Sequence, residues 1–356
     1  MAFNVVVQPG GKIFSAEPGV SILAAALQAG ISLPYSCRMG VCGTCMGKVL
    51  EGQVDHAQSS PAYLDEEARR AGHAMLCQAI PQSDLVIEAS ELQSLSNVKP
   101  RAMPGRVAGL ERAAPDVMVV RVRLPMNENL LFAAGQYMDL MLPQGERRSY
   151  SIATAPTAEG VTELELHIRH VPGGLFTDHV FSAMKPRELL KLEGPFGSFF
   201  IREDSSLPII FLASGTGFAP VKAMLSHAFK MGLHEKREMH LYWGGRTRKC
   251  LYMADLAAQW AQQYKGFRFV PVVSNATAQC EWDGRSGYVH EAVLEDFNDM
   301  SGFQVYACGS PLVIGAAQRD FVSKRGLLKE NFFSDEFLTA ADRAAAAVDQ
   351  GQDRRP

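Results

Sequence analysis

Residues 36–45 read SCRMGVCGTC and place Cys37, Cys42 and Cys45 close together in one loop, with Cys77 further along the chain. This Cys-x4-Cys-x2-Cys spacing with a remote fourth cysteine is the plant-type ligand pattern of a [2Fe–2S] cluster. A zinc site is the alternative, but zinc loops favour paired Cys-x2-Cys units. The spacing therefore predicts that these four thiolates hold a [2Fe–2S] cluster.

The residues around the cysteine loop predict a small domain of strands and helices. Alternating residues predict a hairpin over 3–15, and apolar spacing predicts helices over 21–29 and 60–70. Within the loop, Gly40 and Gly43 can adopt a positive φ and let backbone amides approach the sulfurs. Such amides would stabilise the more negative, reduced cluster.

Composition limits the remaining possibilities. A length of 356 residues suggests about two or three domains. With 35 basic and 38 acidic residues the net charge is −3, which gives no general attraction for nucleic acid or anionic membranes. No stretch is long and apolar enough to span a membrane, and the N-terminus lacks a signal peptide, so we expect a cytoplasmic protein. Seven cysteines do not indicate a secreted disulfide framework.

The chain divides into segments that differ in composition and in predicted secondary structure. We predict a first domain over 1–93, a proline-containing linker over 94–104, a β-rich domain over 105–203, an α/β domain over 204–338 and a tail over 339–356, helical or disordered. The strands predicted in the second and third domains are Val117–Leu124, Gln136–Leu142, Arg148–Ala153, Glu163–Arg169, Leu189–Glu193, Pro208–Ala213, His240–Trp243, Phe267–Val273 and Gln304–Ala307.

Two segments of the β-rich domain carry candidate flavin contacts. In the first, Arg148 can pair with a pyrophosphate, Tyr150 can pack on the flavin ring and Ser151 can reach its edge. The alternative is an amphipathic strand with surface arginines. In the second, a strand with His167 and Arg169 runs into two glycines and a helix start. The residues of this segment that could cradle a phosphate are His167, Arg169, Gly174 and Thr177, although Pro-Gly-Gly is also an ordinary turn.

A glycine turn in the third domain predicts a nicotinamide site. The strand ending at Ala213 leads into Gly215, Thr216 and Gly217, where a helix N-terminus favours a pyrophosphate. A later strand also ends in a glycine-containing turn, at Cys308-Gly309, so Cys308 would face the same crevice. The alternative for Cys308 is an ordinary buried thiol.

Taken in order, these motifs resemble single-chain iron–sulfur flavoreductases over residues 1 to about 338. The stretches that carry the resemblance are 35–37, 147–153, 194–197, 215–222, 306–310 and 332–335. The resemblance implies a multidomain α+β and α/β protein: a β-grasp ferredoxin domain, an antiparallel β-barrel FAD domain and a Rossmann-like parallel-sheet NAD domain. It also implies that Ser151 and Cys308 lie at the hydride-transfer site. A C-terminal aromatic, Phe337 or alternatively Phe333, would stack on the flavin.

The resemblance implies an electron-transfer oxidoreductase that passes electrons from NAD(P)H through FAD and the cluster to a partner enzyme. The family serves bacterial oxygenases, and the partner here is expected to be a deoxysugar dehydrase or an oxygenase component. A different class, a redox-sensing iron–sulfur module without turnover, is disfavoured by the flavin and nicotinamide motifs. We expect a monomer that binds neither nucleic acid nor membrane.

The coenzyme preference rests on a basic run after the strand ending at Gly245. Arg246 and Arg248 lie where the adenosine ribose is expected, and arginines there can accept a 2′-phosphate. The alternative is a solvated basic loop. The resemblance favours NADH, so we predict NADH as the preferred coenzyme, with measurable use of NADPH.

Overall fold

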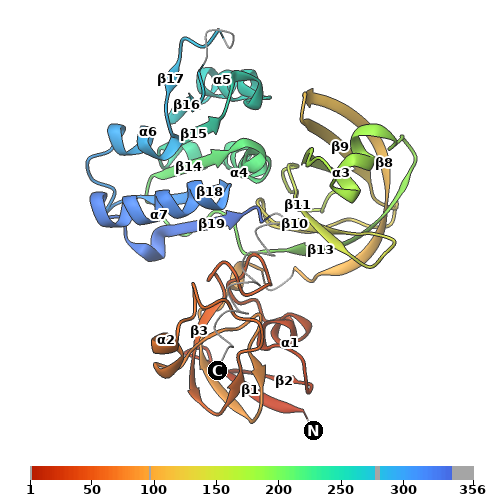
Figure 1. Cartoon of the computed structure of the whole chain (residues 1–356), viewed down its shortest axis with the longest axis vertical. Coiled ribbons are helices and arrows are strands. Elements are labelled where there is room, and N and C mark those ends of the chain that lie inside the picture. The colour runs from red at the N-terminus through yellow and green to blue at the C-terminus, as the bar shows by residue number, and fades with distance from the viewer. Residues whose placement is uncertain (1, 96–97, 277–280, 339–356) are drawn as a thin grey trace. The chain divides into compact units, whose positions relative to one another are not determined.

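The computed structural model describes residues 2–95, 98–276 and 281–338, which form two compact units. Unit 1 is built on the chain up to Pro100 and includes Phe196–Ser198. Unit 2 comprises Arg101–Pro195 and Phe199–Phe337 (Figure 1). The predicted tail over 339–356 lies outside the described residues.

Unit 1 contains a five-stranded sheet in the order β2-β1-β7-β3-β5, with β1 and β7 parallel and the other pairs antiparallel. Its strands are β1 (Phe3–Gln8), β2 (Lys12–Ala16), β3 (Met46–Glu51), β5 (His73–Met75) and β7 (Leu85–Glu88), with a separate pair β4 (Val54–Asp55) and β6 (Ile80–Pro81). A mixed sheet of this order with one helix packed against it is the β-grasp arrangement that the family resemblance implied.

The helices of unit 1 show where caps decide helix starts. In α1 (Ile22–Gln28) the Ser21 side chain accepts a hydrogen bond from the amide of Ala24, as a good N-cap does. The second predicted helix was wrong in its start: α2 is only Glu66–Arg70, capped by Asp65. The predicted start at residue 60 instead belongs to a turn, because the Leu64 amide donates to the Ser60 carbonyl. A short 3-10 turn, η1 (Gln93–Leu95), follows.

The β-rich part of unit 2 is a six-stranded sheet in the order β11-β10-β13-β8-β9-β12, and its registered pairs are antiparallel. Its elements are β8 (Arg101–Ala114), β9 (Val117–Arg123), β10 (Tyr137–Met141), β11 (Arg147–Ser151), β12 (Glu163–Arg169), β13 (Leu189–Phe196) and α3 (Leu175–Ser182). The two edges approach each other, since an isolated bridge pairs Ile152 with Leu166. Strand β8 begins at Arg101, inside the segment predicted as linker.

The remainder of unit 2 is a parallel sheet in the order β17-β16-β15-β14-β18-β19. Its elements are β14 (Ile209–Ser214), η2 (Gly215–Gly217), α4 (Phe218–Lys230), η3 (Leu233–Glu235), β15 (Met239–Gly245), η4 (Arg248–Cys250), α5 (Ala254–Gln263), β16 (Phe267–Val273), β17 (Arg285–Ser286), α6 (Val289–Asp296), β18 (Gln304–Gly309), α7 (Pro311–Arg325), η6 (Lys329–Asn331) and β19 (Phe332–Glu336). Helices α4 and α5 cover one face, and α6 and α7 cover the other (Figure 1).

The strand order of this sheet reverses direction between β14 and β18. Chain order runs outward from β14 through β15 to β16 on one side, and from β18 to β19 on the other. Ligands of open parallel sheets bind beyond the carboxyl ends of the strands at such a reversal. By this rule, a dinucleotide is expected beyond the strand ends at Gly215–Gly217 and Cys308. Among the described residues, no helix is long and apolar enough to cross a membrane.

Candidate functional site

The four predicted cluster cysteines come together in unit 1. Cys45 directly precedes β3 and Cys77 follows β5, so the edge pairing of these two strands brings them into contact. Cys37 and Cys42 form a second pair through a hydrogen bond between their side chains, as do Cys45 and Cys77. The hydrogen bond from its partner thiol lowers the pKa of Cys37 and of Cys77.

This pairing suits a two-iron cluster. Each iron of a [2Fe–2S] cluster takes two cysteine ligands, so two adjacent thiol pairs match the donor set. The assignment of these four cysteines as cluster ligands stays a prediction that rests on their spacing and on this pairing.

Backbone amides reach the sulfurs, as the glycines of the loop predicted. Gly40 and Gly43 have φ of +73° and +71°. The amide of Met39 donates to Cys37 Sγ at 3.3 Å, and the amide of Gly40 bonds to Cys77. Gly40 also has no room for a side chain, because a Cβ there would lie 2.7 Å from Cγ of Gln78. The loop is thus curled tightly around the thiols.

The predicted flavin segment forms strand β11, paired with β10. Ser151 is buried, whereas the Arg148 side chain is 30% exposed and forms an ion pair with Glu146. The ring of Tyr150 lies 5.7 Å from that of Phe176 on α3, centroid to centroid. Strand β11 therefore presents an accessible cation, an aromatic ring and a buried hydroxyl in sequence, which fits the three predicted contacts of a flavin dinucleotide.

The predicted phosphate cradle is a tight turn. Thr177 Oγ1 donates to the Val171 carbonyl at 2.9 Å and accepts from the Val171 amide at 3.2 Å. Gly174 is the N-cap of α3 and provides no side-chain cap, and a Cβ there would lie 2.6 Å from Thr177 Oγ1. The Thr177 hydroxyl thus closes the turn; no side chain of the described residues caps the N-terminus of α3, although Asp178 in its first turn accepts from the Gly173 amide at 3.1 Å.

Strand β12 has two different faces. Leu164, Leu166 and Ile168 are fully buried in the core of the β-rich part. Because side chains alternate along a strand, His167 and Arg169 share the opposite face. Both ring nitrogens of His167 are engaged, Nδ1 with Tyr252 Oη at 2.7 Å and Nε2 with Glu165 Oε1 at 2.8 Å. The predicted cofactor role of His167 stays a prediction, because these contacts occupy its polar atoms.

The Arg169 guanidinium lies against the glycine turn of the α/β part. A Cβ on Gly215 would be 2.6 Å from Arg169 Nη1. Gly215 has a φ of +56°, and its carbonyl accepts from Trp243 Nε1 at 2.9 Å. Arg169 also pairs with Asp116, with 3.2 Å between Nε and Oδ2. The structure therefore brings two predicted cofactor-binding segments, 167–177 and 215–217, to one place.

The two predicted strand ends of the crevice touch through their backbones. A Cβ on Gly217 would lie 2.1 Å from the Cys308 carbonyl oxygen, and one on Gly309 would lie 2.4 Å from the Ser214 carbonyl oxygen. Only residues without a side chain fit such an approach. Thr216, between these glycines, is buried. The glycines thus join the carboxyl ends of β14 and β18.

The Cys308 thiol is buried at this junction. Burial raises its pKa well above the ordinary value, and the nearby Asp335 carboxylate raises it further. Cys308 and Asp335 are partners in the β18–β19 register. The thiol is therefore protonated and acts as a small neutral group, which agrees with a positioning role and not with a nucleophile.

The two candidate aromatic residues lie in different surroundings. Phe333 stacks on Tyr306 inside the sheet, with 4.8 Å between ring centroids. Phe337 follows β19, and its amide donates to the Gly309 carbonyl at 2.8 Å. Phe337 is therefore at the carboxyl edge beside Cys308, whereas Phe333 packs on Tyr306; the flavin-stacking role stays a prediction.

The basic run lies at the same edge of the sheet. Arg246 and Arg248 follow β15 and are exposed. The Arg246 carbonyl accepts from the Asn275 amide at 2.8 Å, which fixes the loop backbone. Ser214 and Gly244 are neighbours in the β14–β15 register. The arginines thus stand one strand away from the glycine turn, and their position near the adenosine ribose stays a prediction.

Three polar residues at the junction were missed by the sequence analysis: Glu165, Lys222 and Tyr252. Lys222 pairs directly with Glu165, and Tyr252 reaches Glu165 through His167. The alternation of charged and apolar residues in Glu163–Arg169 was a signal, since it marks one face of β12 as polar. Lys222 and Tyr252 carry no such local signal, because their partners are distant in the chain.

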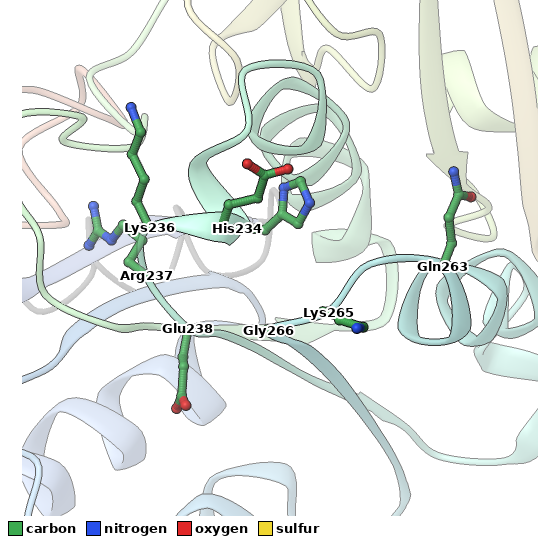
Figure 2. Close-up of a pocket in the computed structure, with 8 residues that line it drawn as sticks. His234, Lys236, Arg237, Glu238, Gln263, Lys265 and Gly266 are labelled. Atoms are coloured by element: carbon green, nitrogen blue, oxygen red, sulfur yellow. The ribbon is translucent and has the colours of Figure 1, made fainter.

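A hollow of about 610 Å³ lies elsewhere, at the amino ends of the parallel strands. It is lined by His234, Glu235, Lys236, Arg237, Glu238, Gln263, Lys265 and Gly266. Figure 2 shows Lys236 and Glu238 pointing in opposite directions, so the charged groups do not converge on one ligand. No predicted site residue lines it, and parallel sheets bind ligands at the other end.

Comparison with protein families gives three matches along the chain. Residues 5–82 match the 2Fe-2S iron-sulfur cluster binding domain, 104–201 the oxidoreductase FAD-binding domain, and 211–319 the oxidoreductase NAD-binding domain. Together with the geometry above, they define an iron–sulfur flavoprotein oxidoreductase that uses a [2Fe–2S] cluster, FAD and NAD(P)H.

Similar proteins agree along nearly the whole length. The chain is 40% identical over 338 residues to the CDP-6-deoxy-L-threo-D-glycero-4-hexulose-3-dehydrase reductase of Yersinia pseudotuberculosis, covering 95% of this chain and 99% of the relative. It is 36% identical to terephthalate 1,2-dioxygenase reductase component 1 of Comamonas, covering 96% and 98%. The crystal structure of the Amycolatopsis cytochrome P450 reductase GcoB matches with a TM-score of 0.79 and 33% identity, covering 95% and 99%.

The chain therefore belongs to the single-chain iron–sulfur flavoprotein reductases, in which a ferredoxin domain is joined to a ferredoxin-reductase-like module. Members of this family transfer electrons from NAD(P)H through FAD and a [2Fe–2S] cluster to a partner protein. The predicted fold class, enzyme class and cofactors are confirmed by these matches.

Proposed function

We propose that the chain is an NADH-dependent reductase that delivers electrons to a deoxysugar dehydrase, in the manner of CDP-6-deoxy-Δ3,4-glucoseen reductase. The observation that carries this proposal is the 40% identity over 95% of the chain to a dehydrase reductase of nearly the same length. Coverage of 99% of that relative includes all three domains, so the similarity is not confined to a shared cofactor module.

The proposed cluster ligands are the two thiol pairs, Cys37 with Cys42 and Cys45 with Cys77. They are supported by the side-chain contacts within each pair and by the amides that point at the sulfurs. When bound, FAD accepts a hydride from NADH and the cluster carries single electrons onward, so the protein needs no nucleophile or general base.

The proposed flavin site uses the accessible face of β11 and the start of α3. Arg148 binds the pyrophosphate, Tyr150 packs against the ring system and Ser151 hydrogen-bonds the ring edge. The uncapped amides after Gly174 bind a phosphate. Support comes from the exposure of Arg148, the burial of Ser151 and the packing of Tyr150 on α3.

The proposed nicotinamide site lies at the crevice between β14 and β18. The turn Gly215–Gly217 holds the dinucleotide, Cys308 and Gly309 position the nicotinamide, Phe337 covers the flavin, and Arg246 lies near the adenosine ribose. The backbone contacts between the two turns support this arrangement. The buried, protonated Cys308 excludes water without carrying charge.

The organisation proposed for the whole chain follows the predicted segments 1–93, 94–104, 105–203, 204–338 and 339–356, with the second domain starting at Arg101 because β8 begins there. We propose a monomer in which each domain holds one cofactor. Gel filtration with light scattering tests the oligomeric state, since a dimer at working concentration would contradict it.

An oxygenase partner is the second candidate. It is favoured by the 36% identity to the terephthalate dioxygenase reductase over 96% of the chain. A redox sensor without turnover is a third possibility, and it predicts no sustained NADH oxidation with cytochrome c as acceptor.

The deciding experiment measures turnover with purified partners, under anaerobic conditions for the dehydrase and in air-saturated buffer with an aromatic substrate for the oxygenase component, because a dioxygenase consumes O2. The reductase is mixed with NADH and either a dehydrase that carries its deoxysugar substrate or the oxygenase component of an aromatic-ring dioxygenase. Product formation with the dehydrase alone supports the proposal. Product formation with the oxygenase component alone overturns it in favour of the second candidate.

A further inference from the structure

A polar network, half-buried except at the buried His167, crosses the junction between the β-rich and α/β parts of unit 2. We call it the junction network, and it consists of Glu165, His167, Lys222 and Tyr252. Glu165 and His167 lie on the polar face of β12, while Lys222 lies on α4 and Tyr252 just before α5. The network therefore joins elements that carry different cofactor segments.

The contacts form one continuous chain. Tyr252 Oη lies 2.7 Å from His167 Nδ1, and His167 Nε2 lies 2.8 Å from Glu165 Oε1. Lys222 Nζ donates to the same Oε1 at 2.9 Å and to the carbonyl of Ala153 at 3.2 Å. Lys222 thus binds two segments of the β-rich part at once, β12 and the residue that follows Ser151-Ile152.

The protonation state of each residue in the junction network follows from its hydrogen-bond partners. Burial raises the pKa of Glu165, but the bonds from His167 and Lys222 lower it to about 2, so this group is a carboxylate. A carboxylate only accepts, so Nε2 of His167 carries the proton and Nδ1 accepts from the Tyr252 hydroxyl. Burial lowers the pKa of His167, which keeps the ring neutral. The network holds a single ion pair, Glu165 with Lys222.

The position of Lys222 connects this ion pair to the proposed nicotinamide site. Lys222 lies in the first turns of α4, which begins at Phe218 immediately after the Gly215–Gly217 turn. Gly217 in turn touches the Cys308 backbone. A shift of α4 away from β12 would therefore move the turn and Cys308 relative to the Ser151–Ala153 segment.

We infer that Lys222, through Glu165 and the Ala153 carbonyl, is a positioning residue that sets the distance between the nicotinamide turn and the flavin-edge strand. This inference rests on the proposed function, because it takes hydride transfer to occur between these two segments. Lys222 contacts neither coenzyme in this assignment. Its loss is expected to slow hydride transfer without a comparable loss of NADH affinity.

The test compares Lys222→Met with Lys230→Met. The control removes an exposed lysine from the last turn of the same helix, where no other described residue forms a hydrogen bond or ion pair with it. Anaerobic stopped-flow reduction by NADH is followed for the FAD-loaded protein. For Lys222→Met we expect the limiting rate to fall at least about tenfold, since small misplacements of reacting groups are costly, while the NADH concentration at half-saturation changes less than about threefold. The control should match the parent protein.

A second readout does not depend on turnover. Hydrogen exchange of the amides in 152–153, 165–167 and 215–222 should accelerate in Lys222→Met and not in the control, with the flavin absorbance spectrum retained. If Lys222→Met fails to fold or to hold FAD, the neutral double variant Glu165→Gln/Lys222→Met is used, because it leaves no unpaired charge at this half-buried junction. Glu165→Gln alone should change the limiting rate in the same direction but less, because Lys222 keeps its bond to the Ala153 carbonyl, and the two losses should not add.

The outcomes separate the two levels of the argument. Suppose that NADH reduces the parent protein, and that the Lys222 variants show the same limiting rate and the same hydrogen exchange as the parent. This result overturns the positioning role and leaves the proposed function standing. A large loss of NADH affinity with an unchanged limiting rate also overturns it, since Lys222 would then bind coenzyme. A parent protein that holds FAD but is not reduced by NADH or NADPH overturns both.

Discussion

Gly217→Ala is the substitution that tests the crevice most directly. The φ of Gly217 is −57°, which any residue can adopt, so backbone strain is not the problem. The problem is space, because the added Cβ would lie 2.1 Å from the Cys308 carbonyl oxygen and 2.6 Å from its carbonyl carbon. Both obstructing atoms are backbone, so no side chain can turn away.

The expected loss of stability and rate follows from how far the two strand ends must move apart to admit the Cβ. Ordinary contact with a Cβ begins at 3.4 Å, so the two strand ends must separate by 3.4 − 2.1 = 1.3 Å along this contact. Overpacking of this kind costs about 1–3 kcal/mol of stability. A displacement of about 1 Å at a reacting site can cost roughly a hundredfold in rate. We therefore expect a modestly destabilised protein whose flavin is reduced by NADH about a hundredfold more slowly.

The assay measures anaerobic flavin reduction by NADH, FAD content and thermal stability for Gly217→Ala. Gly315→Ala is the matched control in the same sheet domain, since Gly315 is exposed within α7 and a Cβ there meets nothing within 4 Å. The control should be stabilised by up to about 1 kcal/mol, because alanine is the better helix former. Parent-like reduction kinetics in Gly217→Ala would refute the placement of the nicotinamide in this crevice.

Four further predictions concern the other sites. Cys42→Ser should lose the cluster absorbance but keep NADH-to-ferricyanide activity, and loss of both with FAD still bound would contradict a modular chain. Arg148→Ala should weaken FAD binding by about 1.5–3 kcal/mol in equilibrium titration, whereas Ser151→Ala should keep FAD and slow its reduction; equal FAD affinity in Arg148→Ala and the parent would disprove the pyrophosphate assignment. Arg246→Ala should reduce kcat/KM for NADPH more than for NADH, and a parent that clearly prefers NADPH would reverse the coenzyme prediction. The pKa of Glu165 is lowered from 4.5 to about 2, so its stabilisation is complete above about pH 4.5 and is lost as pH falls towards 2; Glu165→Gln should remove this dependence from thermal melts, and identical pH profiles would count against it.

The sequence was informative wherever a local pattern required one structure. The cysteine spacing predicted four thiols that the structure does bring together. The strand predicted over Glu163–Arg169 has the observed bounds, because its residues alternate without interruption. Gly215 and Gly217 predicted a turn, and the structure shows that a side chain at either position would have no room.

Features that depend on distant partners were not predictable in the same way. The helix expected from residue 60 starts only at Glu66, since Asp65 is the residue whose side chain caps it. Strand β8 starts at Arg101 despite the nearby prolines, because pairing with β13 provides its hydrogen bonds. Lys222 can pair with Glu165 only after two domains have packed against each other, and no spacing in the sequence predicts that contact.

The two faces of β12 have a practical consequence for exchanging modules between relatives. Even-numbered positions such as Leu164 and Leu166 belong to the core of the β-rich domain, whereas Glu165 and His167 meet the α/β domain. A chimera that imports a foreign coenzyme-binding module should therefore import the odd-numbered residues of this one strand with it. The boundary between the two modules then runs through alternate residues of β12. Joining the two parent sequences at a single position cannot reproduce it.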